Sequence, residues 1–153
     1  MHVFRTMSLN WFAAIVVAAI VNMSPALNAQ TFVTPAVDDR ELYVSVLHFV
    51  HQMNSYAANA GSEQTVHMQR ALCRELNVNV ADLVRISALA DSAETTFWAG
   101  GPKIFADENS RHSNTDQIIA QLSFSLSPEG WKNFHLFVNG PFREKVVMIR
   151  GVK

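Results

Sequence analysis

One stretch near the C-terminus, residues 126–138 (LSPEGWKNFHLFV), most constrains the fold, because it marks both the start of a helix and the face that the helix must bury. Ser127 is a preferred N-cap, and Pro128 fits the first helical position, where no amide partner is needed. At 100° per residue, four large apolar side chains then share one arc: Trp131, Phe134, Phe137 and Val138. A stripe of this size must pack against other elements, which the rest of the chain has to supply.

Three upstream segments show the same amphipathic helical spacing, and each carries start or stop signals. Asp38 or Asp39 caps the first segment, and Gly61 ends it before a tight connection to the second. Asn79 caps the third segment, with Asp82 three residues further on as a variant of the capping box. The expected helices cover residues 38–60, 62–76 and 79–98.

Helical spacing also assigns particular residues to the faces of the first two helices. Tyr56 falls in the apolar arc of the first helix, and Val66 falls on the apolar side of the second. Arg70 and Arg74 fall on the opposite, polar side of that second helix.

The C-terminal half alternates between a polar stretch and further helical patterns. Residues 100–115 are the most polar and least regular part of the mature chain, and we interpret them as a long surface loop. Asp116 then caps the next helix, while Asn139-Gly-Pro141 is expected to stop the helix that follows Ser127. The segment after Pro141 is either a final helix or a strand-like tail, and the helical reading is favoured because a lone strand has no partner. The expected helices cover residues 116–125, 128–139 and 141–149.

These patterns predict the fold class. Every regular segment has helical spacing, although the alternation at 121–126 would also suit a short strand. The connections are short apart from one loop, and no internal repeat or domain linker is present. We therefore expect residues 30–153 to form a single all-α domain, a compact antiparallel bundle of four or five helices.

The first 29 residues have the order of a secretory signal peptide. A short region with Arg5 precedes an apolar run at 11–21, Pro25 breaks the helix, and small Ala29 occupies the cleavage position. We predict cleavage after Ala29. Mass analysis of the exported protein is expected to give an N-terminus at Gln30, and an intact Met1 would refute the prediction.

The properties of the mature chain limit its partners. The eleven-residue apolar run is shorter than the ~20 residues of a membrane span, so no stable span is expected after cleavage. Removing Arg5 with the signal turns 12 basic residues into 11 against 13 acidic ones, which argues against nucleic acid as a partner. Cys73 is the only cysteine, so no intramolecular disulfide forms. The expected location is outside the cytoplasm, either periplasmic or extracellular.

Histidines are the residues that most need testing as metal ligands. The candidates are His48, His51, His67 and His135. His48 and His51 lie three residues apart but point away from the apolar arc of their helix, as does His67, so we interpret all three as solvated. His135 borders the aromatic arc, where a stacked, partly buried structural histidine is the simpler interpretation.

Other catalytic signatures are weak in this sequence. Cys73 falls inside an apolar arc, where cysteine behaves as a small hydrophobe. No nucleophile-elbow or Ser-x-x-Lys motif is present, and Gly100-Gly101 is followed by a proline that cannot donate to a phosphate. A hydrolase built on the polar loop at 101–113 would depend on Asp107, Glu108 or His112. No cofactor is expected.

Four short patterns also give the chain a resemblance to a known group. They are Leu47-His-Phe-Val50, Asn59-Ala-Gly61, Leu76-Asn-Val-Asn-Val80 and Leu126-Ser-Pro-Glu-Gly-Trp131. Their order, over roughly residues 41 to 139, resembles that of small, uncharacterised exported helical proteins of Gram-negative soil bacteria. The resemblance implies an exported helical bundle and carries no activity or catalytic residue.

A non-enzymatic binding or interaction module is the function that these observations favour. Helical cores account for nearly every apolar residue, and no convergent set of polar residues is left over. An envelope protein is the class of partner that export implies. The alternatives are a metal- or small-ligand-binding envelope protein, based on the histidines, and the loop-based hydrolase.

Overall fold

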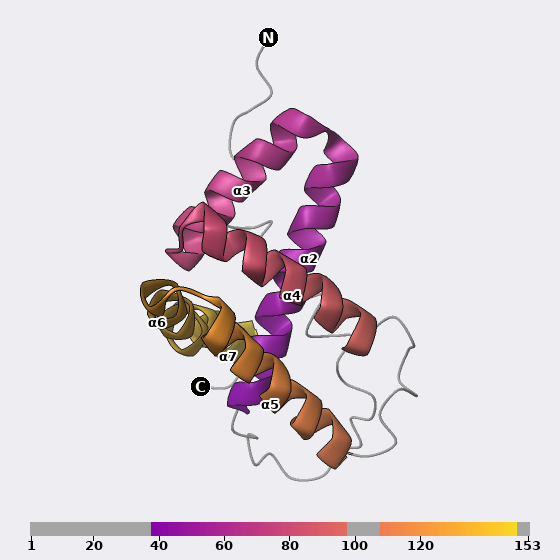
Figure 1. The fold of residues 1–153 in the computed structure, drawn as a ribbon, viewed down its shortest axis with the longest axis vertical. Helices are drawn as coiled ribbons and strands as arrows, with labels where there is room; N and C mark the ends of the chain where they lie inside the picture. The colour runs from indigo at the N-terminus through magenta and orange to yellow at the C-terminus, as the bar shows by residue number, and fades with distance from the viewer. Residues whose placement is uncertain (1–37, 98–107, 150–153) are drawn as a thin grey trace.

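A computed structural model describes residues 38–97 and 108–149. These residues form an all-α bundle, as the sequence predicts, with no strand among them (Figure 1). The predicted signal peptide and its cleavage site lie outside the described residues. Among those described, no helix is long and apolar enough to cross a membrane.

The helices follow the chain in a simple order. The first three are α2 (Asp39–Ala60), α3 (Ser62–Leu76) and α4 (Val80–Phe97). The next is α5 (Glu108–Ser125), and then α6 (Pro128–Phe137), the π-helix η2 (Val138–Phe142) and α7 (Arg143–Ile149) run on without a break. Counted with α6–η2–α7 as one helical run, these are five helices. Most of the bounds lie within one residue of those expected from the sequence.

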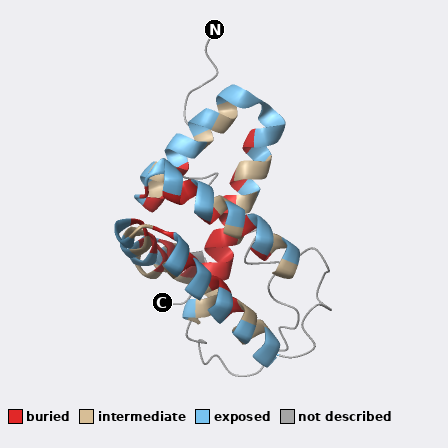
Figure 2. Cartoon of the chain, viewed as in Figure 1, coloured by how far each residue is buried: buried red, intermediate tan, exposed pale blue. Residues whose placement is uncertain are grey.

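Helix α2 is the centre of the bundle and contacts α3, α4, α5 and η2. Every residue from Leu42 to Leu47 is buried, although the sequence pattern assigned only one arc of this helix to the core. The difference arises because this first half, Leu-Tyr-Val-Ser-Val-Leu, is apolar on nearly all sides and is covered from several directions. The second half is covered less, and Tyr56, expected in the arc, is 46% exposed. Figure 2 shows this change along α2.

The aromatic stripe of α6 lies in the core, as predicted. Phe134 and Val138 are fully buried and Phe137 nearly so, while Trp131 packs on the edge of the core. Ser127 caps the helix, because its hydroxyl accepts a hydrogen bond from the amide of Gly130 at 3.0 Å. Start signal and buried face are therefore both as the sequence indicated.

The loop predicted for residues 100–115 is wrong from Glu108 onward, because α5 begins there rather than at Asp116. Residues 98–107 lie outside the described residues. The helix was hard to recognise in the sequence because only a narrow stripe of α5 is buried. That stripe consists of Thr115, Ile118 and Leu122. Asp116 is not a cap: it lies within α5, and its carboxylate accepts a hydrogen bond from Arg40 Nε at 2.7 Å.

The expected stop at Asn139-Gly-Pro141 is also wrong, because the chain passes through it as the π-helix η2. Pro141 has no amide hydrogen, and its ring collides with the carbonyl four residues earlier in a regular α-helix. The wider π-turn accommodates the ring and lets α7 continue the run, so the segment after Pro141 is helical. Phe142 and Val146 then join the core.

A buried carboxylate joins the starts of α4 and α6. Asp82 has no exposed surface. It accepts hydrogen bonds from the Ser127 amide (2.9 Å), the Ser127 hydroxyl (2.6 Å), Asn79 Nδ2 (2.8 Å) and Arg85 Nη1 (3.1 Å). Burial alone would raise the pKa of Asp82, but the hydrogen bonds from Ser127 and Arg85 outweigh it and lower the pKa. Asp82 is therefore ionised in the folded protein and holds the starts of α4 and α6 together, a role that we call the Asp82 clamp.

Candidate functional site

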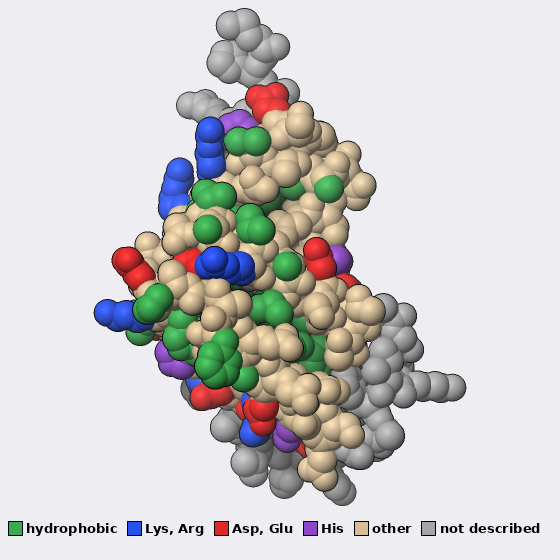
Figure 3. Space-filling view, viewed as in Figure 1, with side chains coloured by type: hydrophobic (Ala, Val, Ile, Leu, Met, Phe, Trp, Pro, Cys, Tyr) green, Lys and Arg blue, Asp and Glu red, His purple; other side chains and the backbone are tan. Residues whose placement is uncertain are grey.

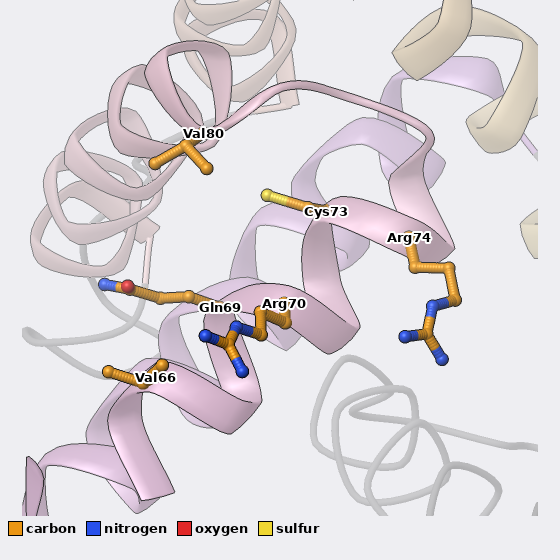
Figure 4. Close-up of a pocket in the computed structure, with 6 residues that line it drawn as sticks. All are labelled: Val66, Gln69, Arg70, Cys73, Arg74 and Val80. Carbon is orange, nitrogen blue, oxygen red and sulfur yellow. The ribbon is translucent and has the colours of Figure 1, made fainter. Parts of the chain in front are cut away.

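Among the described residues, a hollow of about 500 Å³ lies between α3 and the start of α4, and we call it the α3–α4 groove. It is lined by Val66, Gln69, Arg70, Cys73, Arg74 and Val80. Figure 4 shows five of these side chains on successive turns of α3, with Val80 facing them from α4. The groove is thus built by two helices that meet closely only at one end.

The groove exists because α3 is anchored to the core mainly by its last turns. Leu72 and Leu76 are its only buried residues, and its first half has none. Val66, which the sequence pattern placed on the apolar side of this helix, is 45% exposed as a result. Across the groove Val80 is 63% exposed, and Val84, one turn along α4, is 59% exposed. Exposed apolar side chains on both sides of a hollow are typical of binding sites.

The rim of the groove is positively charged. Arg70 and Arg74 extend away from Val80 in Figure 4, and Figure 3 shows Lys and Arg side chains beside exposed hydrophobic ones in this part of the molecule. Neither Arg70 nor Arg74 forms an ion pair or hydrogen bond with another described residue. In the part of the chain that the structure describes, no acidic side chain lines the groove. The site therefore combines an apolar surface with two arginines that have no partner among the described residues.

Cys73 lies on the floor of the groove and is partly buried rather than fully enclosed. Its sulfur points toward Val80 in Figure 4. Burial raises the pKa of the Cys73 thiol, so the thiolate is a minor species at neutral pH. The residue is accordingly a poor nucleophile that contributes apolar surface, and as the only cysteine it is a single-site reporter of groove occupancy.

His48 and His51 do not point to solvent as the helical pattern suggested, because α4 packs against that side of α2. His48 Nδ1 is 2.7 Å from Glu94 Oε2, and His51 Nδ1 is 2.7 Å from Asp91 Oδ1. One further turn along, Asn54 donates to the Ser87 hydroxyl at 2.9 Å. The three pairs form a row of polar contacts between α2 and α4, which we call the polar ladder. Histidines of α2 make two of the three contacts.

His67 and His135 lie elsewhere in the bundle. His67 is exposed on α3, 3.9 Å from Glu63. His135 is exposed on α6, where its Nδ1 hydrogen-bonds the buried Tyr43 hydroxyl and its ring lies 5.6 Å from that of Trp131. Burial raises the pKa of Tyr43, so its hydroxyl stays protonated. The structure does not bring the four histidines together, and within the described ranges no three metal-ligating side chains converge.

Ser55, His51 and Asp91 contact one another in the order of a catalytic nucleophile, base and acid. Ser55 Oγ is 3.4 Å from His51 Nε2, and Asp91 binds the other ring nitrogen. Acyl transfer also needs free donors for the oxyanion, but Ser55 lies inside α2, where backbone amides are committed to the helix. The nearby Asn54 amide already donates to Ser87. The arrangement is a cross-link and lacks the parts of an active site.

The residues of the predicted loop-based hydrolase give no active site among those described. Asp107 lies outside the described residues. His112 is 3.8 Å from Glu108 within α5 and 3.7 Å from Asp38 at the start of α2. These contacts tie the two helix starts together.

A second, polar hollow of about 310 Å³ surrounds the start of α6. Its lining includes Asn77, Asn79, Asn133 and Asp82. Asp82 already accepts four hydrogen bonds there, and Asn133 donates to the Asn77 carbonyl at 2.9 Å. These groups are occupied with holding α4 and α6 together.

Sequence reasoning missed the α3–α4 groove. It assigned Val66 to the core and Arg70 and Arg74 to an ordinary solvated face. One signal was available in the sequence. The first half of α3 contains few large apolar residues, so Val66 has few apolar neighbours on its own helix. No family model matches the chain, and no curated protein and no solved structure matches it.

Proposed function

We propose that this protein is a non-enzymatic binding module, and that the α3–α4 groove receives an apolar segment of a partner protein. The observation that carries the proposal is the pair of exposed valines, Val66 and Val80, on opposite sides of a hollow of about 500 Å³, with exposed Val84 one turn further along α4. Leaving this much apolar surface in water is unfavourable, and a bound segment would cover it.

The shape of the groove favours a protein segment over a small molecule. Small-molecule sites usually enclose most of the ligand surface. Here the lining side chains remain widely exposed, with Val80 at 63% and Val66 at 45%, so a small ligand would stay largely in solvent. The signal-like start of the chain, residues 1–29, supports the proposal that the partner is met after export and belongs to the envelope.

Carboxylates placed in the groove are expected to abolish its binding of an apolar probe. Val66→Asp and Val80→Asp each put a charge against the apolar surface, and we expect each to weaken binding of the neutral dye Nile red about tenfold or more. Val80 opens α4, where an acidic residue is favoured, so Val80→Asp should fold normally. Dye fluorescence titrations measure the effect, and circular dichroism verifies the fold.

Leu136→Asp is the matched control, because Leu136 is 57% exposed on α6 and does not line the groove. It should leave dye binding unchanged. Bound dye should also slow the modification of Cys73 by a thiol reagent. Equal dye binding by wild type, Val66→Asp and Val80→Asp would refute the groove as the binding site.

A further inference from the structure

The apolar wall of the α3–α4 groove continues along α4 beyond the hollow. Val84 and Ala88 follow Val80 at intervals of four residues, and all three are exposed. Residues four apart share one side of a helix, so they form a stripe about 12 Å long at a rise of 1.5 Å per residue. Such a stripe matches the side chains that a second helix presents on successive turns.

The two arginines on the rim have no carboxylate partner in the described ranges. Arg70 and Arg74 lie one turn apart on α3, and like charges at this spacing repel each other. The acidic residues of the same helix face other partners, with Glu63 3.9 Å from His67 and Glu75 2.9 Å from Lys145. A carboxylate bound at the rim would remove the repulsion.

We infer that the occupant of the groove is an amphipathic helix of a partner protein that carries Asp or Glu beside its apolar side. The inference rests on the binding role proposed above. The apolar side of that helix lies on the α4 stripe, and its carboxylates face Arg70 and Arg74, whose planar groups bind carboxylates through paired hydrogen bonds. Two arginines on a chain of nearly balanced charge are too few for nucleic acid or an anionic membrane, which recruit larger basic surfaces.

Two synthetic helical peptides test this partner class. They share the same apolar residues at i, i+4 and i+7 and differ only in carrying Glu or Lys along the flank. Fluorescence anisotropy with the whole mature protein should show at least about tenfold tighter binding of the Glu peptide, and the preference should shrink with added salt. The double variant Arg70→Glu/Arg74→Glu should reverse the preference.

Lys132→Glu is the charge control, because Lys132 is exposed on α6 outside the groove. It should keep the preference for the Glu peptide. The bound Glu peptide should displace Nile red and slow the modification of Cys73, which places it in the groove.

The other possible outcomes separate the inference about the acidic partner from the proposed binding function. Equal binding of both peptides, or a preference that survives Arg70→Glu/Arg74→Glu, overturns the acidic partner while Nile red binding still supports the groove. Tighter binding to vesicles of anionic lipid than to the Glu peptide overturns it in favour of a membrane surface. Failure of both peptides together with failure of Nile red overturns the proposed function itself.

Discussion

Phe134→Ala is expected to lower the free energy of unfolding by about 3 to 5 kcal/mol, the usual cost of removing a fully buried aromatic ring. Phe134 has no exposed surface, and its ring lies 6.2 Å from that of Tyr43 on the central helix. The loss combines the lost burial of the ring with a cavity that α2 and α6 cannot both close. Urea unfolding followed by circular dichroism measures it.

Leu136→Ala provides the comparison on the same helix. Leu136 is two residues away but 57% exposed, so its truncation should cost less than about 1 kcal/mol. If Phe134→Ala proved as mild as Leu136→Ala, the aromatic stripe would face a partner rather than the core.

Asp82→Ala is expected to cost about 2 to 4 kcal/mol, because it removes a fully buried carboxylate and leaves several partly buried donors without their acceptor. The Ser127 amide, the Ser127 hydroxyl and Asn79 Nδ2 all donate to this one carboxylate. Their loss loosens the starts of α4 and α6 together. Thermal and urea unfolding of Asp82→Ala and Asp82→Asn measure the effect, and the amide should retain part of the stability.

The same clamp makes stability depend on acid. The pKa of Asp82 is lowered in the folded protein, so the unfolded chain takes up the proton first as the pH falls. The contribution of Asp82 is complete above the ordinary carboxylate pKa of about 4 and is lost as the pH falls through the lowered folded value. Urea midpoints measured from about pH 5 down to pH 2 should therefore decline less steeply in Asp82→Asn.

Two further variants separate the clamp from surface charge. A methyl group at Gly130 would lie 2.2 Å from Asp82 Oδ2, so Gly130→Ala must displace the carboxylate and should also flatten the acid dependence. The pKa of Asp116 is likewise lowered by Arg40, but that pair is exposed, so Asp116→Asn should change the profile much less. An acid profile unchanged in Asp82→Asn would contradict the assignment.

Local signals in the sequence were enough to locate most helices. Asp38, Asn79 and Ser127 each accept a hydrogen bond from an amide in the first turn of the helix that they start. Signals that depend on neighbours were not enough. The polarity of residues 108–115 concealed the start of α5. Pro141 lies in a wider π-helical turn instead of ending the helix, and α7 beyond it contributes Val146 to the core.

The candidate site was harder to predict because it depends on how two helices diverge. Helical periodicity assigns Val66 to an inner face, yet nothing in the local pattern says that Leu72 and Leu76 are the only residues of α3 that become fully buried. The same gap explains the error over His48 and His51, since their polar side is solvated only if no helix covers it. The sequence did not reveal that α4 packs against the two histidines, or that a hollow lies beside Val66.

The unequal anchoring of α3 has a consequence for hydrogen exchange and folding. Leu72 and Leu76 tie its end to the core, whereas Ser62 to Ala71 includes no buried residue. Amide protons in that first half are protected mainly by helix bonds within a short segment, so local opening there costs much less than global unfolding. The opposite wall begins at Val80, close to the buried Asp82 that joins the starts of α4 and α6. The groove therefore has one firmly held side and one side that opens locally.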